Sequence, residues 1–328
     1  MLFDVSVDIR EDSILQYDGR LLELLLCDKS TGRNIIWATD DYAAYGEAYQ
    51  SDREILTEFI TGEHAGLIRP RIAKTVEEQG SRTRGKAEVF TPCWVCNVQN
   101  NLVDEQWFGR KDVFNREDAQ GWSATTDPIA FPGGFAKTWK KYVDAQRMEI
   151  TCGEAPYLVS RYDTVTGELL PIERRIGLLD RKLRVVNENA QAEDEWFKWA
   201  LRSYQSVYGF EYQGDNLLLA RENLLMTFIE YYQQRFDCAP SKVQLRQIAN
   251  VIAWNIWQMD GLKYVVPESC HEIEQEVYTF FGIEKTTDPC PGCQKGNALA
   301  HNGVYCRIKD WRSHVTLRYI DMMKGGAT

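Results

Sequence analysis

The feature that most restricts the fold is an alternation of short apolar segments with helical ones in the second half of the chain. The apolar segments lie at 147–152, 206–212 and 255–262. The intervening residues at 191–205, 215–235 and 241–253 have the apolar spacing of helices. Strands that alternate with helices in this way are typical of a parallel, doubly wound α/β sheet.

The segments on either side of this alternation are expected to be rich in β-strands. Residues 1–45 alternate apolar and polar side chains, with turns at Asp18-Gly19 and Thr31-Gly32. Residues 109–140 are rich in Gly, Asp, Asn and Pro and are expected to form a long loop. The expected organisation is an N-terminal β-rich region with a basic connector at 1–85, an α/β domain at 86–285 and a small β-rich appendage at 286–328.

The charge balance excludes a general nucleic-acid binder. The chain has 38 Lys and Arg against 48 Asp and Glu, a net charge of −10. Any contact with DNA would therefore need a local basic patch or a partner subunit. Two basic clusters are present, at 69–86 and at Arg174, Arg175, Arg181, Lys182 and Arg184. The first is interpreted as a solvated connector, with an arm that contacts phosphates as the alternative.

The cysteines and the N-terminus favour a cytoplasmic protein without a membrane segment. No basic region followed by an apolar run begins the chain, and the apolar stretch 21–26 is too short to span a bilayer. Nine cysteines in such a chain indicate free thiols or a metal site rather than a disulfide framework.

Residues suited to bind a nucleoside cofactor follow each expected strand. The first strand carries Glu149 and leads into the turn Cys152-Gly153-Glu154-Ala155, whose small residues let a ligand approach the backbone. Glu211 ends the second strand, where a carboxylate can accept hydrogen bonds from two ribose hydroxyls. Asp260 follows the third strand and could accept from an adenine amine. The alternative is structural: an ordinary turn, and acids that cap the next helix.

The order of these segments resembles that of N6-adenine DNA methyltransferases, especially the modification subunits of restriction systems. The similar segments, within about residues 86–265, are Glu88-Val89-Phe90-Thr91-Pro92 at a helix start, Glu149 with Cys152-Gly153, Glu211 followed by Leu219–Leu224, and Met259-Asp260. The resemblance implies a Rossmann-like methyltransferase domain that binds S-adenosyl-L-methionine. The residues it assigns to the cofactor are Thr91, Pro92, Glu149, Cys152, Gly153, Glu154, Ala155, Glu211 and Asp260.

The catalytic tetrapeptide of that family is absent from this chain. Asp or Asn followed by Pro-Pro and an aromatic residue accepts hydrogens from the target amine and stacks on a flipped base, but this chain has no adjacent prolines. The candidate replacement is Asp40-Asp41-Tyr42, which offers a carboxylate and an aromatic ring after the apolar run 35–38. The alternative is a strand that enters a polar turn. A second fragment, Asp288-Pro289-Cys290-Pro291, has the expected position but lacks the ring.

A zinc site is expected in the last forty residues. Cys290 and Cys293 flank a Pro-Gly turn, and His301 and Cys306 follow, which gives a plausible set of four tetrahedral ligands. The alternative is a group of free thiols. Cys93 and Cys96 form a second pair without further ligands and are interpreted as packing residues.

The sequence thus favours a DNA adenine-N6 methyltransferase, or a methyltransferase-like subunit of a restriction or phage-defence system that works with a specificity or nuclease subunit. The alternative is a catalytically inactive relative that binds the cofactor and a partner. A nicotinamide-dependent oxidoreductase is disfavoured because the first turn lacks the Gly-x-Gly-x-x-Gly pattern.

Overall fold

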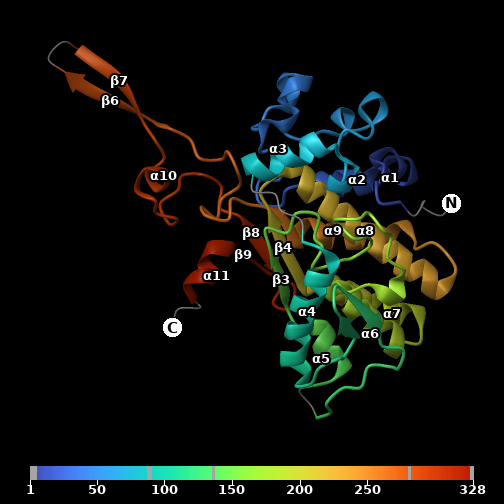
Figure 1. Ribbon diagram of the computed structural model, residues 1–328. Helices are drawn as coiled ribbons and strands as arrows, with labels where there is room; N and C mark the ends of the chain where they lie inside the picture. Colours follow the sequence, from blue (N-terminus) through green and yellow to red (C-terminus); the bar gives the residue numbers. More distant parts are fainter. Residues whose placement is uncertain (1–5, 87–90, 135–136, 280–281, 326–328) are drawn as a thin grey trace.

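A parallel sheet lies at the centre of the molecule. The computed structural model describes residues 6–86, 91–134, 137–279 and 282–325. Strands β3 (Arg147–Ile150), β4 (Val207–Glu211) and β5 (Ile256–Gln258) form a three-stranded sheet in the order β3-β4-β5 (Figure 1). The predicted alternation is therefore present, and the protein is a mixed α/β protein.

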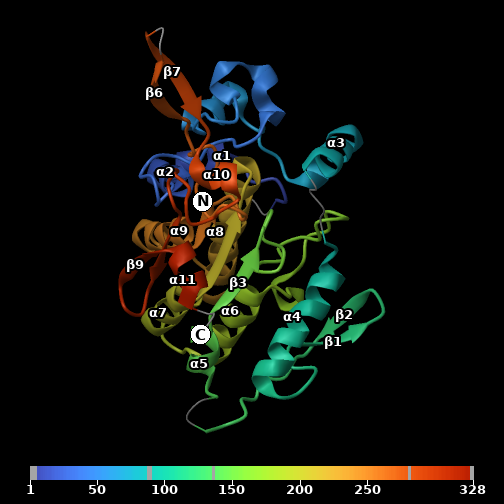
Figure 2. The same cartoon turned by 90° about the vertical axis from the view of Figure 1, so that its left-hand side faces the viewer.

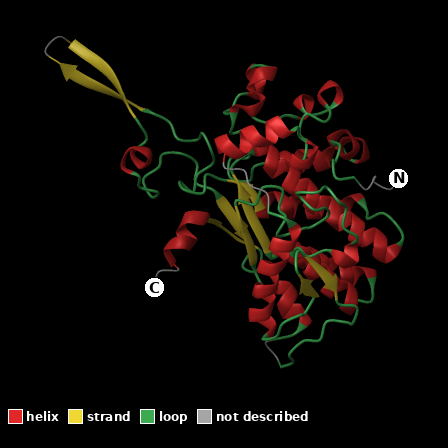
Figure 3. Cartoon of the chain, in the orientation of Figure 1, coloured by secondary structure: helices red, strands yellow, loops and turns green. Residues whose placement is uncertain are grey.

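Helices cover one face of this sheet (Figure 3). Between β3 and β4 lie the 3₁₀ segment η6 (Ile172–Arg174), α6 (Leu178–Asn189) and α7 (Glu193–Gln205), and between β4 and β5 lie α8 (Gly214–Phe236) and α9 (Lys242–Asn255). Helices α7, α8 and α9 contact β4. Helix α8 is buried along most of its length because other helices pack around it, and its apolar side chains form much of the main core.

The opposite face is covered by C-terminal residues rather than by a second layer of helices. Tyr208, Phe210 and Trp257 project from the sheet and pack with Ile308 of β8 (Arg307–Asp310) and with Tyr319 of α11 (Tyr319–Gly325). Strand β8 pairs antiparallel with β9 (Val315–Arg318). The segment predicted as an appendage thus completes a second apolar core.

The prediction of β-strands in residues 1–45 is wrong for the part that the structure describes. Helices α1 (Glu11–Tyr17) and α2 (Gly19–Leu26) occupy this region, and extended residues after them form isolated bridges such as Cys27 with Asn34. Leu21, Leu22, Leu25 and Leu26 are all fully buried. Their spacing of one, three and four residues matches a helix, and Asp18 caps α2 by accepting from the Arg20 backbone N–H.

Short 3₁₀ segments and one helix connect this region to the α/β part. They are η1 (Asp40–Tyr45), η2 (Glu47–Tyr49), η3 (Thr57–Phe59), η4 (Gly62–His64), η5 (Arg71–Ala73) and α3 (Val76–Lys86). Helix α4 (Cys93–Phe108) follows, as predicted from Thr91-Pro92. The predicted loop 109–140 contains a hairpin of β1 (Asn115–Asp118) and β2 (Gly121–Ala124), and α5 (Trp139–Asp144) begins near its end.

A second antiparallel hairpin projects from the body of the molecule. Its strands are β6 (Ile273–Thr279) and β7 (Gly282–Asp288), and α10 (Pro291–Lys295) lies at its base (Figures 1 and 2). The boundary expected between residues 285 and 286 falls inside β7. Among the described residues, no helix combines the length and the apolar character needed to cross a bilayer.

Candidate functional site

The carboxyl ends of β3 and β4 bring together residues that the sequence assigned to a cofactor. The Gly153 N–H donates to Glu211 Oε2 at 2.8 Å, and the Gln213 N–H donates to Glu211 Oε1 at 3.2 Å. Cys152 continues the sheet pairing, since its N–H donates to the Phe210 carbonyl at 2.9 Å. Burial raises the pKa of Glu211, although the backbone donors partly offset this effect.

The turn after β3 has an unusual backbone. Gly153 has φ of +52° and Ala155 has φ of +64°. The first value suits glycine, whereas alanine adopts the left-handed region only at a cost. The turn is held in place because Glu149 accepts the Tyr157 and Leu158 N–H groups at 3.3 and 3.1 Å. Burial raises the pKa of Glu149 to about 8.

Glu154 holds neighbouring segments together. Its side chain accepts from the Arg71 N–H at 2.7 Å and from the Tyr162 hydroxyl at 2.5 Å. Asn223 of α8 donates to the Glu154 carbonyl at 3.2 Å. The structure therefore gives Glu154 a role in the shape of the turn.

Asp260 lies in a turn directly after β5. Its Oδ1 accepts from the N–H groups of Leu262 and Lys263 at 2.9 and 3.1 Å, and its Oδ2 lies 3.3 Å from Lys263 Nζ. The Met259 N–H donates to the Glu211 carbonyl at 3.0 Å, which extends the β4–β5 pairing to this point. Asp260 therefore lies at the same edge of the sheet as Glu211.

Thr91 and Pro92 lie at the start of α4, whereas Glu88, Val89 and Phe90 lie outside the described residues. The Thr91 carbonyl accepts from Thr164 Oγ1 at 3.0 Å, and the Cys93 N–H donates to Asp163 at 3.0 Å. These bonds join α4 to the loop that follows the β3 turn. Cys93 and Cys96 are buried, in agreement with their interpretation as packing residues.

The segment Asp40-Asp41-Tyr42 lies in η1, and its aromatic ring is inside the protein. Tyr42 packs on Trp37 with 4.6 Å between ring centroids, and its hydroxyl donates to Asp215 Oδ2 at 2.9 Å. Asp41 lies 3.3 Å from Arg82, and Asp40 accepts from the Ser51 N–H at 3.3 Å. In this arrangement Tyr42 has no free face for a flipped base.

The first basic cluster is not simply a solvated connector. Lys74 Nζ and Arg82 lie 3.3 and 2.8 Å from Asp215 at the start of α8, and all three side chains are buried. This ion-pair network could not be predicted from the sequence, because Asp215 is 133 residues away from Arg82. Exposed Arg69 pairs instead with Glu78 at 3.3 Å.

The second basic cluster is also largely internal. Arg175 pairs with Glu230 at 2.5 Å and Arg181 pairs with Asp104 at 2.6 Å, while Lys182 donates to Ser206 Oγ at 2.5 Å. These three basic side chains are buried and cannot contact phosphates in this structure. The chain therefore offers fewer cations for DNA than its sequence suggests.

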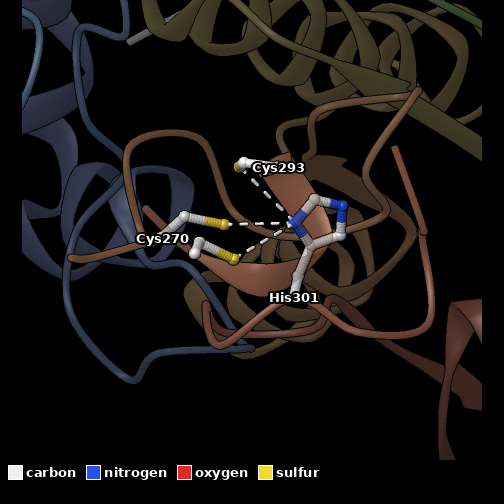
Figure 4. A group of neighbouring side chains, drawn as sticks. Cys270, Cys293 and His301 are labelled. Atoms are coloured by element: carbon white, nitrogen blue, oxygen red, sulfur yellow. Dashed lines mark hydrogen bonds between the residues drawn. The ribbon is translucent and has the colours of Figure 1, made fainter. Parts of the chain in front are cut away.

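A cysteine–histidine cluster lies at the base of the β6–β7 hairpin, with one ligand that differs from the prediction. The members are Cys270, Cys290, Cys293 and His301, whose ligand atoms all lie within 4.8 Å of one another (Figure 4). Cys306 is excluded because it is buried in the second core, where its Sγ donates to the Gln258 carbonyl at 3.2 Å. Cys270 was missed because the whole hairpin separates it from Cys290 in sequence.

Comparisons with protein-family models, with curated proteins and with solved structures give no match.

Proposed function

We propose that this chain binds S-adenosyl-L-methionine at the carboxyl edge of its parallel sheet, as the methyltransferase-like subunit of a DNA-modifying restriction or phage-defence system. The observation that carries the proposal is the 2.8 Å contact between Glu211 and the Gly153 N–H, which joins an acidic strand end to a glycine turn. Ligands of open α/β sheets bind outside the carboxyl ends of the strands, and an acid there recognises ribose hydroxyls.

The neighbouring groups are consistent with an adenosyl ligand. Glu211 would accept the ribose hydroxyls, and the turn at Gly153 would lie against the methionine part. Asp260 follows β5, one strand further along the same edge, where its carboxylate can accept from an adenine amine. The Phe210 ring lies beside the Asp260-Gly261 turn, since a Cβ added to Gly261 would lie 2.9 Å from it.

Replacing Glu211 with alanine should weaken S-adenosyl-L-methionine binding about ten- to a hundredfold, because a hydrogen bond to a charged group contributes about 1.5–3 kcal/mol. Calorimetric titration with S-adenosyl-L-methionine, S-adenosylhomocysteine and NAD measures this directly. Glu168→Ala, which removes an exposed carboxylate, is the control. Unchanged affinity in a folded Glu211→Ala protein, or a preference for NAD, would contradict the proposal.

For catalysis, we propose that the isolated chain binds the methyl donor without efficient transfer to DNA. The Pro-Pro-aromatic tetrapeptide is absent, Tyr42 is buried, and much of the basic charge is paired internally. A partner subunit would then supply the missing DNA contacts, since few phosphate contacts give little affinity at physiological salt.

Incorporation of labelled methyl groups into mixed-sequence DNA tests the proposal that the isolated chain does not methylate DNA efficiently. We expect little transfer by the wild type and by Asp40→Ala, Asp41→Ala and Tyr42→Phe proteins. Robust transfer by the wild-type chain without a partner would refute the proposal that the isolated chain is inactive. If the wild type transfers methyl groups and the variants at 40–42 do not, these residues belong to the mechanism.

A further inference from the structure

The base of the β6–β7 hairpin gathers four side chains that can hold one metal ion. Cys270 precedes β6, Cys290 follows β7, Cys293 lies on α10 and His301 lies in the next loop. Nδ1 of His301 is 3.5 Å from Cys270 Sγ, 3.6 Å from Cys290 Sγ and 3.7 Å from Cys293 Sγ. The three sulfurs thus surround one imidazole nitrogen (Figure 4).

These separations fit the edges of a zinc tetrahedron. With Zn–S bonds of about 2.3 Å and a Zn–N bond of about 2.0–2.1 Å, the nitrogen–sulfur edge is about 3.5–3.6 Å. Three thiolates and one imidazole form a donor set that favours Zn²⁺ over Mg²⁺ or Ca²⁺, which prefer oxygen ligands. Four protein ligands also complete the coordination sphere, which is typical of a structural rather than a catalytic zinc site.

The surrounding backbone orients the ligands. The Asn302 N–H donates to Cys290 Sγ at 3.3 Å, a contact that stabilises a thiolate. Asn302 also exchanges hydrogen bonds with the backbone of His271, at 2.7 and 3.2 Å. Gly292 must lack a side chain, because a Cβ there would lie 2.5 Å from Nδ1 of His301.

The cluster joins the hairpin to the central sheet. The Val266 N–H donates to the Val304 carbonyl at 2.8 Å, and the Cys306 N–H donates to the Tyr264 carbonyl at 3.1 Å. These bonds pair the segment that leads from β5 to the cluster with the segment that leaves the cluster after His301. A metal ion here would therefore fix the direction in which the hairpin leaves the body of the molecule.

We propose that Cys270, Cys290, Cys293 and His301 bind one structural Zn²⁺ that closes the base of the β6–β7 hairpin. Binding deprotonates the thiols and releases their protons to solvent, so affinity rises with pH. The core around β3, β4 and β5 has its own buried side chains and should remain folded without the ion.

Elemental analysis of the full chain, purified without chelator from zinc-containing medium, tests the proposal. We expect stoichiometric zinc in the wild type, with X-ray absorption showing three sulfurs at about 2.3 Å and one nitrogen. Cys270→Ser and Cys293→Ser should lose the metal, whereas Cys306→Ala and the surface control Cys238→Ser should retain it. Loss with Cys306→Ala but not with Cys270→Ser would overturn this ligand set.

Titration of the chelator-treated chain with Zn²⁺ alone covers the case in which a variant fails to fold. We expect tight one-to-one binding and slower protease cleavage between residues 271 and 289 after zinc is added. A disulfide between two of these cysteines, iron in place of zinc, or no binding at neutral pH would overturn the proposal.

Discussion

Replacing Asp215 with asparagine is expected to lower the free energy of unfolding by about 3 kcal/mol, because it leaves Lys74 and Arg82 as buried cations without their main counter-charge. The Asp215 side chain is 1% exposed, and those of Lys74 and Arg82 are each 6% exposed. Breaking a buried ion pair usually costs about 3–5 kcal/mol, and the lower end applies here because Asp41 remains 3.3 Å from Arg82.

Urea unfolding at neutral pH measures this effect, with Asp237→Asn as the matched control. Asp237 is an exposed residue with φ of +52° at the other end of α8, a conformation that asparagine tolerates. An equal, small change in both variants would show that the network at Asp215 does not stabilise the fold.

The same network makes the protein sensitive to acid. Burial alone would raise the pKa of Asp215, but the charges of Lys74 and Arg82 outweigh it and hold this pKa well below its ordinary value of 3.8. The folded-state pKa is thus depressed, so the stabilisation is present above about pH 4 and is lost as the pH falls towards the folded-state value. Asp215→Asn should remove this part of the acid transition.

The central sheet could be predicted because its signals are local. The segments at 147–152, 206–212 and 255–262 contain strands β3, β4 and β5, and the predicted helices between them are present. In the N-terminal region the same reasoning failed. The alternating pattern of residues 1–45 predicts strands, but the buried leucines from Leu21 to Leu26 have the spacing of a helix.

The contacts that organise the candidate sites could not be predicted, because they join residues far apart in sequence. Arg221, in the middle of the segment Leu219–Leu224, donates to the Ile256 and Ala253 carbonyls at 2.8 and 3.3 Å. Its role in this structure is to hold the end of α9 and the start of β5. Cys270 likewise joins the cysteine–histidine cluster only because β6 and β7 pair, which returns the chain to its starting point.

The second large effect concerns Glu222, a carboxyl group in the middle of α8. It is fully buried, and among the described residues neither of its carboxyl oxygens has a hydrogen-bond partner. Burial, together with nearby Glu11 and Asp8, raises the pKa of Glu222 well above its ordinary value of 4.5, and Arg161 offsets this only in part. Burial likewise raises the pKa of Glu11 to about 8.

Because these folded-state pKa values are raised, the folded protein keeps both protons over a pH range in which the unfolded chain has lost them. Their favourable contribution is complete below about pH 4.5 and decreases as the pH rises towards the folded-state values, by about 1.4 kcal/mol per pH unit for each group. Glu222→Gln keeps the shape of the side chain and cannot ionise. Between about pH 5.5 and 7.5, the variant should gain roughly 3 kcal/mol relative to the wild type.

Urea unfolding at several pH values in this range shows whether Glu222 stays protonated in the folded protein or ionises as it does in the unfolded chain. Glu168→Gln, which neutralises an exposed carboxylate, should leave the pH dependence of the wild type unchanged. Parallel curves for the wild type and Glu222→Gln would show that Glu222 ionises in the folded protein as readily as in the unfolded chain. A flatter curve for Glu222→Gln alone would establish that the centre of α8 holds a neutral carboxylic acid at neutral pH.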